Sequence, residues 1–383
     1  MVYFDNAATT RCSDNVINIV NDAMKKDYGN PSSKHNMGVD AEKYIRTAAE
    51  RIAATLKCKE KEIIFTSGGT ESNNMALIGG ALARQRAGKH IITTGIEHAS
   101  VYEPLGFLES LGFEISALSV DEKGHVSIDE LLRLIRDDTI LVSTMMVNNE
   151  IGAIEPAAEI ADAIKSRNSS ILYHVDAIQA YGKLRIYPHR MKIDMLSVSG
   201  HKIHGPKGVG FLYLDENVRI RPIIYGGGQQ KGMRSGTMNV PGIAGLGQAA
   251  YDIYHDFDEI IPYITRIKDH IIDAVSALEG VRVNSLKGNA GAPHIVSISV
   301  KGVRAEVLLH ALESDGIYVS SGSACSSHHP GISGTLKGIG VEDELLDSTI
   351  RVSLSEYNTM EEADLFADAL RTEIEKLRRY TRK

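Results

Sequence analysis

The chain has 383 residues, of which 43% are hydrophobic, and this length and composition predict a globular protein with two domains. The formal net charge of -7, without a long basic run, argues against nucleic-acid binding. We expect a cytoplasmic protein, because the sequence shows no apolar run long enough for a membrane span, no secretory leader, and only three cysteines, too few for a disulfide framework.

Short apolar runs alternate with helical patterns through the first two thirds of the chain. We expect strands at 62–67, 90–95, 113–120, 139–147, 171–177, 194–200 and 208–214. Helices are expected between them, for example at 72–88 and at 156–167, where Pro156 suits a first helical turn. The alternation predicts an α/β fold with a mostly parallel seven-stranded sheet covered by helices.

The pattern changes after about residue 255. We expect helices at 257–279 and 305–315 and strands at 294–300 and 349–355. An amphipathic C-terminal helix follows them. We therefore predict a large domain of residues 16–256. Residues 257–383, joined by residues 1–15, are predicted to form a smaller α+β domain.

Polar residues follow four of the predicted strands. In open parallel sheets, ligands bind beyond the carboxyl ends of the strands, so these junctions are candidate sites. Each junction alone has an ordinary structural explanation, such as a turn or a helix cap. Together they predict one site, with the candidates Gly69, Thr70, His98, Asp176, Gln179, Ser199, His201 and Lys202.

These side chains match the groups that pyridoxal 5'-phosphate requires. Backbone N–H groups and hydroxyls suit its phosphate, and a histidine suits its ring face. The carboxylate of Asp176 suits a protonated ring nitrogen, and a lysine amine suits its aldehyde. We prefer Lys202 to Lys207 for the aldehyde, because Lys202 directly follows a strand end whereas Lys207 lies in the glycine-rich turn before the next strand.

Nine motifs, in order along residues 3 to about 370, resemble the NifS/IscS-like cysteine desulfurases of the aminotransferase class V family. They are DNAATT (5–10), TSGGTESNN (66–74), EHAS (97–100), VNNEIG (147–152), YHVDAIQ (173–179), SGHKIHGPKG (199–208), RSGT (234–237), SSGSACSS (320–327) and IRVSLS (350–355). The resemblance implies the type I fold of pyridoxal 5'-phosphate-dependent transferases.

The resemblance also implies roles for individual residues. Lys202 would hold the cofactor, His98 would stack on its ring, Asp176 would bind the ring nitrogen and Gln179 the ring hydroxyl. A phosphate cup would be formed by Gly69, Thr70, Ser199 and His201, with Thr237 from the second subunit of a homodimer. Asn149 and Arg351 would bind the carboxylate of L-cysteine, and Cys325 would be the nucleophile.

The implied reaction converts L-cysteine to L-alanine and leaves a persulfide on Cys325. Lys202, Cys325 and His98 are the catalytic candidates, whereas nothing around Cys12 and Cys58 suggests catalysis. The expected sulfur acceptor is a protein, either an iron–sulfur scaffold or a tRNA-thiolation enzyme, or else a thiocarboxylate carrier. The serine-rich context of Cys325 resembles the group with a mobile cysteine loop.

Two features depart from the family pattern. His328 and His329 replace an Ala/Leu-rich segment, and since adjacent side chains point apart, we interpret them as surface histidines rather than metal ligands. We also expect the chain to lack the C-terminal extension that some relatives use to dock an iron–sulfur scaffold. The alternative functions are a selenocysteine lyase or another lyase of the same fold, and a non-catalytic sulfur-relay module.

Overall fold

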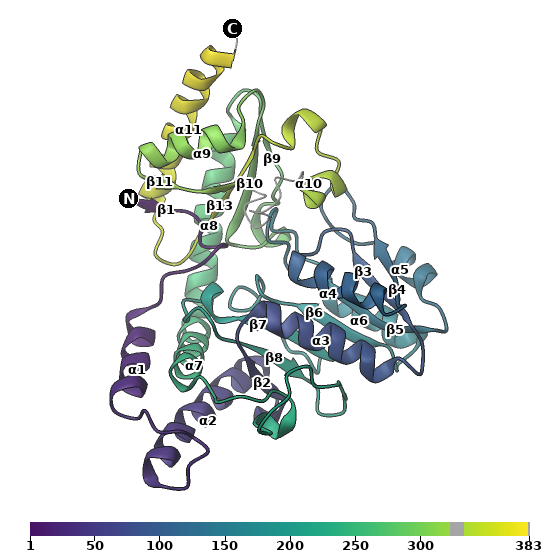
Figure 1. Ribbon diagram of the computed structural model, residues 1–383. Helices are drawn as coiled ribbons and strands as arrows, with labels where there is room; N and C mark the ends of the chain where they lie inside the picture. Colours follow the sequence, from purple (N-terminus) through teal and green to yellow (C-terminus); the bar gives the residue numbers. More distant parts are fainter. Residues whose placement is uncertain (322–332, 382–383) are drawn as a thin grey trace.

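The computed structural model describes residues 1–321 and 333–381. A seven-stranded sheet lies in the lower part of the molecule as seen in Figure 1, and a four-stranded sheet lies in the upper part. The cofactor site predicted from the sequence lies between these two parts.

The seven-stranded sheet confirms the seven predicted strands. In spatial order it contains β2 (Ile63–Thr66), β8 (Gly210–Leu214), β7 (Met195–Ser199), β6 (Leu172–Asp176), β5 (Thr139–Met145), β3 (His90–Thr94) and β4 (Glu114–Leu118). β8 runs antiparallel to both of its neighbours, and the other strand pairs are parallel. The carboxyl ends of β2, β3, β5, β6 and β7 therefore face the same edge of the sheet.

Helices cover both faces of this sheet, which explains why its strands are apolar without alternation. Ile91 packs in the same core as Met75 and Leu105, whereas the next residue, Ile92, packs on the opposite face with Ile160. One face is covered by α3 (Gly69–Arg84) and α4 (Ala99–Ser110). The other is covered by α2 (Asn36–Leu56), α5 (Ile128–Leu134), α6 (Ala157–Arg167) and α7 (Val240–His255), with α1 (Asp14–Lys25) packed on α7.

Two helix starts differ slightly from the prediction. α3 begins at Gly69 rather than at residue 72, because Gly68 is the N-cap residue and Gly69 and Thr70 already belong to the first helical turn. Pro156 is the N-cap residue of α6 rather than a member of its first turn. Short 3₁₀ turns connect several elements: η1 (Glu60–Glu62), η2 (Gly200–Lys202), η3 (Gln230–Gly232), η4 (Gly288–Ala290) and η6 (Asp343–Leu345).

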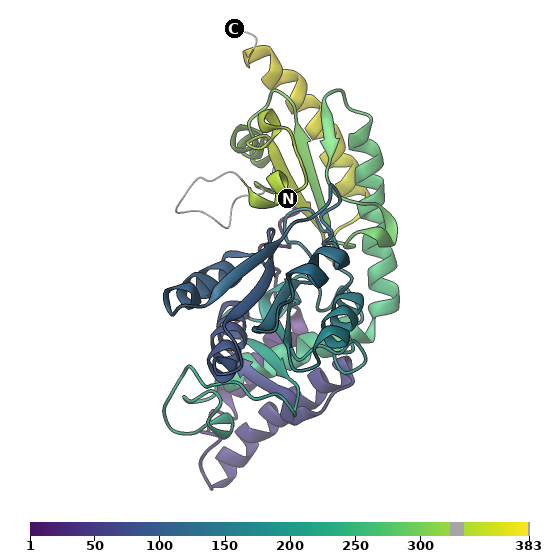
Figure 2. The same cartoon turned by 90° about the vertical axis from the view of Figure 1, so that its right-hand side faces the viewer.

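The smaller sheet is antiparallel and has its own apolar core. Its order is β12 (Ser320–Ser321), β13 (Thr349–Ser353), β10 (Ile295–Val300) and β9 (Val281–Val283). The helices packed with it are α8 (Phe257–Ser276), α9 (Ala305–Ser314) and α11 (Met360–Thr381), of which α8 and α11 lie side by side in Figure 2. α10 (Gly334–Gly338) lies beside the loop after β5. Within the described ranges, every helix is too short or too polar to cross a lipid bilayer.

The N-terminal segment belongs to this smaller core. β1 (Val2–Tyr3) pairs in parallel with β11 (Ile317–Tyr318), and Phe4 packs edge-on against Phe366 with ring centres 5.8 Å apart. We therefore keep the division into residues 16–256 and residues 1–15 with 257–383 as a proposal, which the two separate cores support.

Candidate active site

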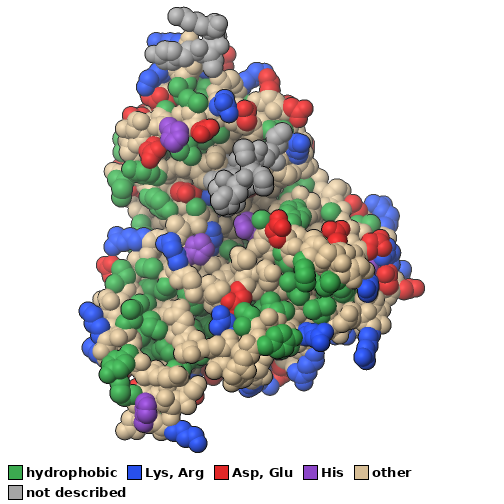
Figure 3. Space-filling view, in the orientation of Figure 1, with side chains coloured by type: hydrophobic (Ala, Val, Ile, Leu, Met, Phe, Trp, Pro, Cys, Tyr) green, Lys and Arg blue, Asp and Glu red, His purple; other side chains and the backbone are tan. Residues whose placement is uncertain are grey.

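The carboxyl ends of the parallel strands line a cavity of about 370 Å³. β6 ends at Asp176 and β7 ends at Ser199, and α3 begins directly after β2. Ten of the residues predicted for the site line this cavity: Gly69, Thr70, His98, Asn149, Asp176, Gln179, Ser199, His201, Lys202 and Arg351. In Figure 3, histidine and basic side chains gather along the junction between the upper and lower parts of the molecule.

Lys202 enters the cavity from the η2 turn that follows β7. Its Nζ donates hydrogen bonds to the backbone oxygens of Ala7, at 2.7 Å, and Ala8, at 2.8 Å. Lys207, the alternative in the same stretch, is exposed and does not line the cavity. The two carbonyl groups come from the N-terminal segment, whose contact with the lysine the sequence did not predict.

The start of α3 forms a cradle for an anion. Gly68 has a φ of +150°, a conformation that side chains rarely adopt, and it turns the chain from β2 into the helix. A Cβ added to Gly69 would lie 2.2 Å from Cδ1 of Ile178, so a larger residue here would force the Ile178 side chain to move. The first backbone N–H groups of a helix have no acceptor within the helix. Gly69 and Thr70, in the first turn of α3, line the cavity.

Ser199 lies beside this cradle, and His201 lines the same cavity. Burial, followed by the charges of Lys202 and Lys207, lowers the pKa of His201 to about 4. Its Nδ1 lies 3.2 Å from the hydroxyl of Thr9. A bound phosphate would oppose the effect of the two lysines, because an anion stabilises the protonated imidazole.

Asp176 supplies a buried carboxylate at the bottom of the cavity. Burial raises its pKa, whereas a hydrogen bond from the N–H of Ile178 at 3.0 Å and one from Nδ2 of Asn73 at 2.8 Å oppose that rise. A protonated pyridine nitrogen would provide the counter-charge that such a carboxylate needs. With the anion cradle and the lysine amine, this carboxylate shows that the residues present fit pyridoxal 5'-phosphate.

Asn73 also connects Asp176 to His98. Its Nδ2 donates to Oγ of Ser100 at 2.9 Å, and that oxygen lies 2.8 Å from Nδ1 of His98. The Ser100 backbone N–H also donates to Nδ1 at 3.0 Å, so a neutral His98 carries its proton on Nε2. Asn73 was not predicted as a site residue, although its position four residues after Gly69 places both on one helix face.

Arg351 projects from β13 and is almost fully buried. Its Nη1 donates to the backbone oxygen of Asn149 at 2.8 Å, and its Nη2 lies 3.1 Å from Oδ1 of Asp5. Burial raises the pKa of Asp5, while the guanidinium lowers it. Nε of Arg351 is buried and has no hydrogen-bond partner within the described residues, so its N–H group is available to a ligand. Asp5 was not predicted as a site residue.

Of the remaining predicted residues, Thr237 is exposed and does not line the cavity. Cys325, with His328 and His329, lies outside the described residues. Burial, together with the charge of Glu62, raises the pKa of Cys58 to about 12, which argues against a reactive thiol there.

Glu97 is a buried carboxyl group next to the cavity, and it was not predicted as a site residue. Burial, and then the charge of Asp176, raises its pKa to about 8. The unfolded carboxyl has a pKa near 4.3, so between about pH 4.3 and 8 the folded protein holds a proton that the unfolded chain releases. Glu97 therefore lowers stability progressively as the pH rises through this window.

We expect Glu97→Gln to unfold at about the parent temperature at pH 5 and at a clearly higher temperature at pH 8. The difference at pH 8 should correspond to roughly 1–4 kcal/mol, because the amide keeps a donor in place but cannot ionise. Thermal unfolding at both pH values measures it, with the exposed Glu306→Gln as the control. Parallel pH profiles for parent and Glu97→Gln would contradict the prediction.

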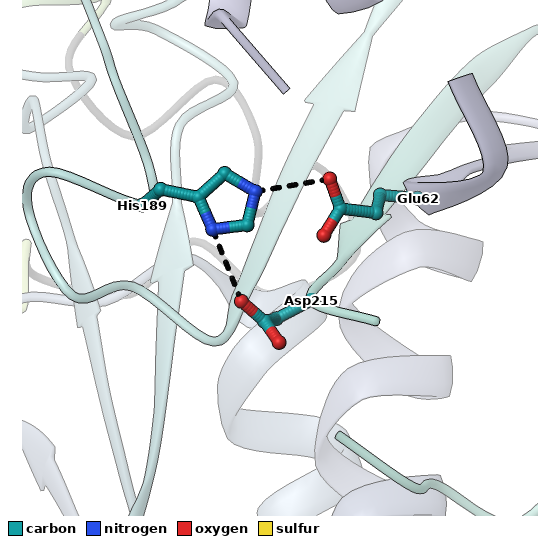
Figure 4. Close-up of side chains that lie close together, drawn as sticks. All are labelled: Glu62, His189 and Asp215. Carbon is teal, nitrogen blue, oxygen red and sulfur yellow. Dashed lines mark hydrogen bonds and ion pairs between the residues drawn. The ribbon is translucent and has the colours of Figure 1, made fainter. Parts of the chain in front are cut away.

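A second cluster of titratable side chains lies at the opposite edge of the large sheet. Figure 4 shows the imidazole of His189 between two carboxylates, with Nε2 3.0 Å from Glu62 and Nδ1 3.3 Å from Asp215. Each ring nitrogen is directed at a different carboxylate, so the three groups do not converge on one metal position. Glu62 also accepts the backbone N–H groups of Lys59 and Glu216, and the cluster ties the start of β2 to the end of β8.

Comparisons with known proteins agree with this geometry. Residues 2–366 match the aminotransferase class-V family. The cysteine desulfurase IscS of Dictyoglomus turgidum is 43% identical over 98% of this chain and 95% of its own length, and that of Methanosarcina thermophila is 40% identical over 98% and 93%. Among solved structures, a NifS-like protein has a TM-score of 0.93 at 37% identity, covering 98% of this chain and 99% of its own. The structure of SspA in complex with cysteine has a TM-score of 0.82 at 34% identity, covering 94% and 100%.

Proposed function

We propose that this chain, which belongs to the aminotransferase class-V family and is a cysteine desulfurase, uses pyridoxal 5'-phosphate held at Lys202 to remove the sulfur of L-cysteine. The observation that carries the proposal is the convergence of three groups on one cavity. They are the amine of Lys202, the buried carboxylate of Asp176 and the guanidinium of Arg351.

The cavity walls suggest how the cofactor is held. Asp176 would pair with the ring nitrogen, Gln179 would donate to the ring hydroxyl oxygen, and His98 would lie against the ring face. The phosphate would be held by the start of α3 and by polar groups beside it, namely Gly69, Thr70, Ser199 and His201. When bound, pyridoxal 5'-phosphate supplies an aldehyde that joins to amines and a ring that takes up electrons from the substrate Cα.

Lys202 and Arg351 have different roles toward the substrate. Arg351 donates to the carboxylate of L-cysteine, using the Nε that has no hydrogen-bond partner within the described residues, and Asn149 lies beside it. Lys202 removes the proton from Cα and later returns a proton, because its amine lies in the same cavity as the bound substrate. Holding the carboxylate at Arg351 orients Cα toward this amine.

Cys325 receives the sulfur. Its thiolate attacks the substrate sulfur, the bond between that sulfur and Cβ breaks, and Cβ gains a proton. The overall change is L-cysteine plus the Cys325 thiol giving L-alanine plus a Cys325 persulfide, so no external oxidant or reductant is needed. We propose that a protein then takes the sulfur, either an iron–sulfur scaffold or a tRNA-thiolation enzyme.

Incubating the cofactor-loaded protein with L-cysteine tests this function. The expected result is L-alanine, together with a mass increase of one sulfur atom on the peptide that contains Cys325. A protein that makes alanine from selenocysteine but not from cysteine would be a selenocysteine lyase. A protein without a visible absorption band and without alanine formation would be a non-catalytic sulfur-relay module.

We propose a homodimer in which Thr237 of one subunit reaches the phosphate of the other. The loop that carries Thr237 is exposed, and it is anchored near the start of α3 by Arg234, whose Nε lies 2.7 Å from Glu71. Mixing inactive Lys202→Ala with inactive Thr237→Ala subunits should restore part of the activity, since one site of the mixed dimer then has both residues. Absence of rescue, with subunit exchange confirmed by mass spectrometry of tagged subunits, would argue against the shared site.

A further inference from the structure

His294 reaches from the smaller part of the molecule to the cavity wall, where it contacts Gln179. It directly precedes β10 and is 2% exposed. Its Nε2 lies 3.2 Å from Oε1 of Gln179. We propose that His294 is a positioning residue that holds the Gln179 amide with an N–H group toward the ring oxygen of the cofactor. This inference rests on the proposed function, which assigns that ring oxygen to Gln179.

The orientation of the Gln179 amide follows from its two neighbours. Its nitrogen lies 2.9 Å from the backbone oxygen of Ala7, and a carbonyl oxygen can only accept a hydrogen bond, so the nitrogen belongs on that side. The amide oxygen therefore faces His294. Because this oxygen also only accepts, the proton of the imidazole must be on Nε2.

The surroundings of His294 agree with a neutral ring that has one N–H group. Burial is the main cause of a pKa well below the usual histidine value, and nearby positive charges lower it further, in the order Lys183, Arg351, Lys268 and Lys202. Nδ1 is buried and has no hydrogen-bond partner within the described residues. With Nε2 as the donor and Nδ1 as the unprotonated nitrogen, the contact to Gln179 is the one in which His294 acts as a donor.

His294 and Ala7 thus hold opposite ends of one amide that lines the cavity. The Gln179 nitrogen carries two hydrogens, and Ala7 accepts one of them, so the second is available to a ligand. A donor at the ring oxygen stabilises negative charge there. A reversed amide would present its own oxygen instead and would repel that charge.

The pH dependence of the visible absorption band tests this role without measuring turnover. The visible band changes when the cofactor-loaded protein loses one proton, and the ring oxygen then carries more uncompensated negative charge. A hydrogen-bond donor to that oxygen therefore favours the deprotonated form. We expect His294→Leu to raise the midpoint by roughly 0.5–1 pH unit, which is the size of an ordinary hydrogen-bond effect.

Two further variants separate positioning from a general loss of packing. His294→Gln places an amide N–H near the position of Nε2 and should keep the parent midpoint. In a Gln179→Ala background, His294→Leu should produce no additional shift, because the amide through which His294 acts is gone. His294→Ala provides the same comparison if His294→Leu does not fold, and circular dichroism reports folding.

The outcomes distinguish this inference from the proposed function. A parent protein that develops no visible band with pyridoxal 5'-phosphate would overturn both. A parent that titrates normally, with folded His294→Leu or His294→Ala at the same midpoint, would overturn the inference alone. A shift that persists in the Gln179→Ala background would also overturn it, because the effect would then not pass through the amide.

Discussion

Lys202→Ala is expected to lower L-alanine formation from L-cysteine by about 10³-fold or more and to abolish the covalent cofactor adduct that borohydride traps. Two functions are lost together, since the Lys202 amine is proposed both to hold the cofactor and to move the Cα proton. The amine that donates hydrogen bonds to the backbone oxygens of Ala7 and Ala8 would be lost, and the alanine methyl group cannot replace these hydrogen bonds. Alanine release and mass spectrometry after borohydride reduction measure the two effects.

Lys207→Ala is the matched control. Lys207 lies five residues later in the same glycine-rich stretch, but its side chain is exposed and outside the cavity. This variant should keep the borohydride adduct and nearly the parent rate. A covalent adduct retained in Lys202→Ala would contradict our assignment and would move the attachment point to another lysine.

Cys325→Ser is expected to leave cofactor binding intact while removing nearly all alanine formation from L-cysteine. A serine hydroxyl stays protonated at neutral pH and is a far weaker nucleophile than a thiolate, so no group would take the sulfur. The variant should remain yellow and should show the parent's first spectral change when L-cysteine is added, because binding does not use the thiol. No persulfide should form. Selenocysteine, from which selenium leaves more readily, should still turn over slowly.

Cys12→Ser and Cys58→Ser are the controls for this substitution. Sγ of Cys12 lies 3.3 Å from the backbone oxygen of Gly205, and Cys58 is partly buried with a raised pKa, so neither thiol lies in the cavity. Both variants should form the persulfide on Cys325. If Cys325→Ser produced alanine from cysteine at the parent rate, the desulfurase mechanism would be wrong and a lyase mechanism would replace it.

The core of the site was predictable because strands and the residues after them are local features. An apolar run at 139–147 predicted a strand, and β5 spans Thr139–Met145. Asp176 and Ser199 end neighbouring parallel strands, so geometry places them at the same sheet edge. Lys202 lies in the η2 turn that directly follows β7, and it lines the cavity, whereas Lys207 does not.

The sequence by itself therefore determined the fold class, the family resemblance and the types of residue at the strand ends. Only the tertiary structure showed which distant groups contact them. The carbonyl of Ala7 meets Lys202, Asp5 meets Arg351, and His294 meets Gln179, in each case across more than a hundred residues of chain. Hydrophobic periodicity specifies which face of an element is buried, but it carries no information about which polar group of another element lies opposite. Those pairings arise when the smaller core positions the N-terminal segment, β10 and β13 against the edge of the large sheet, because that packing sets the distances between them.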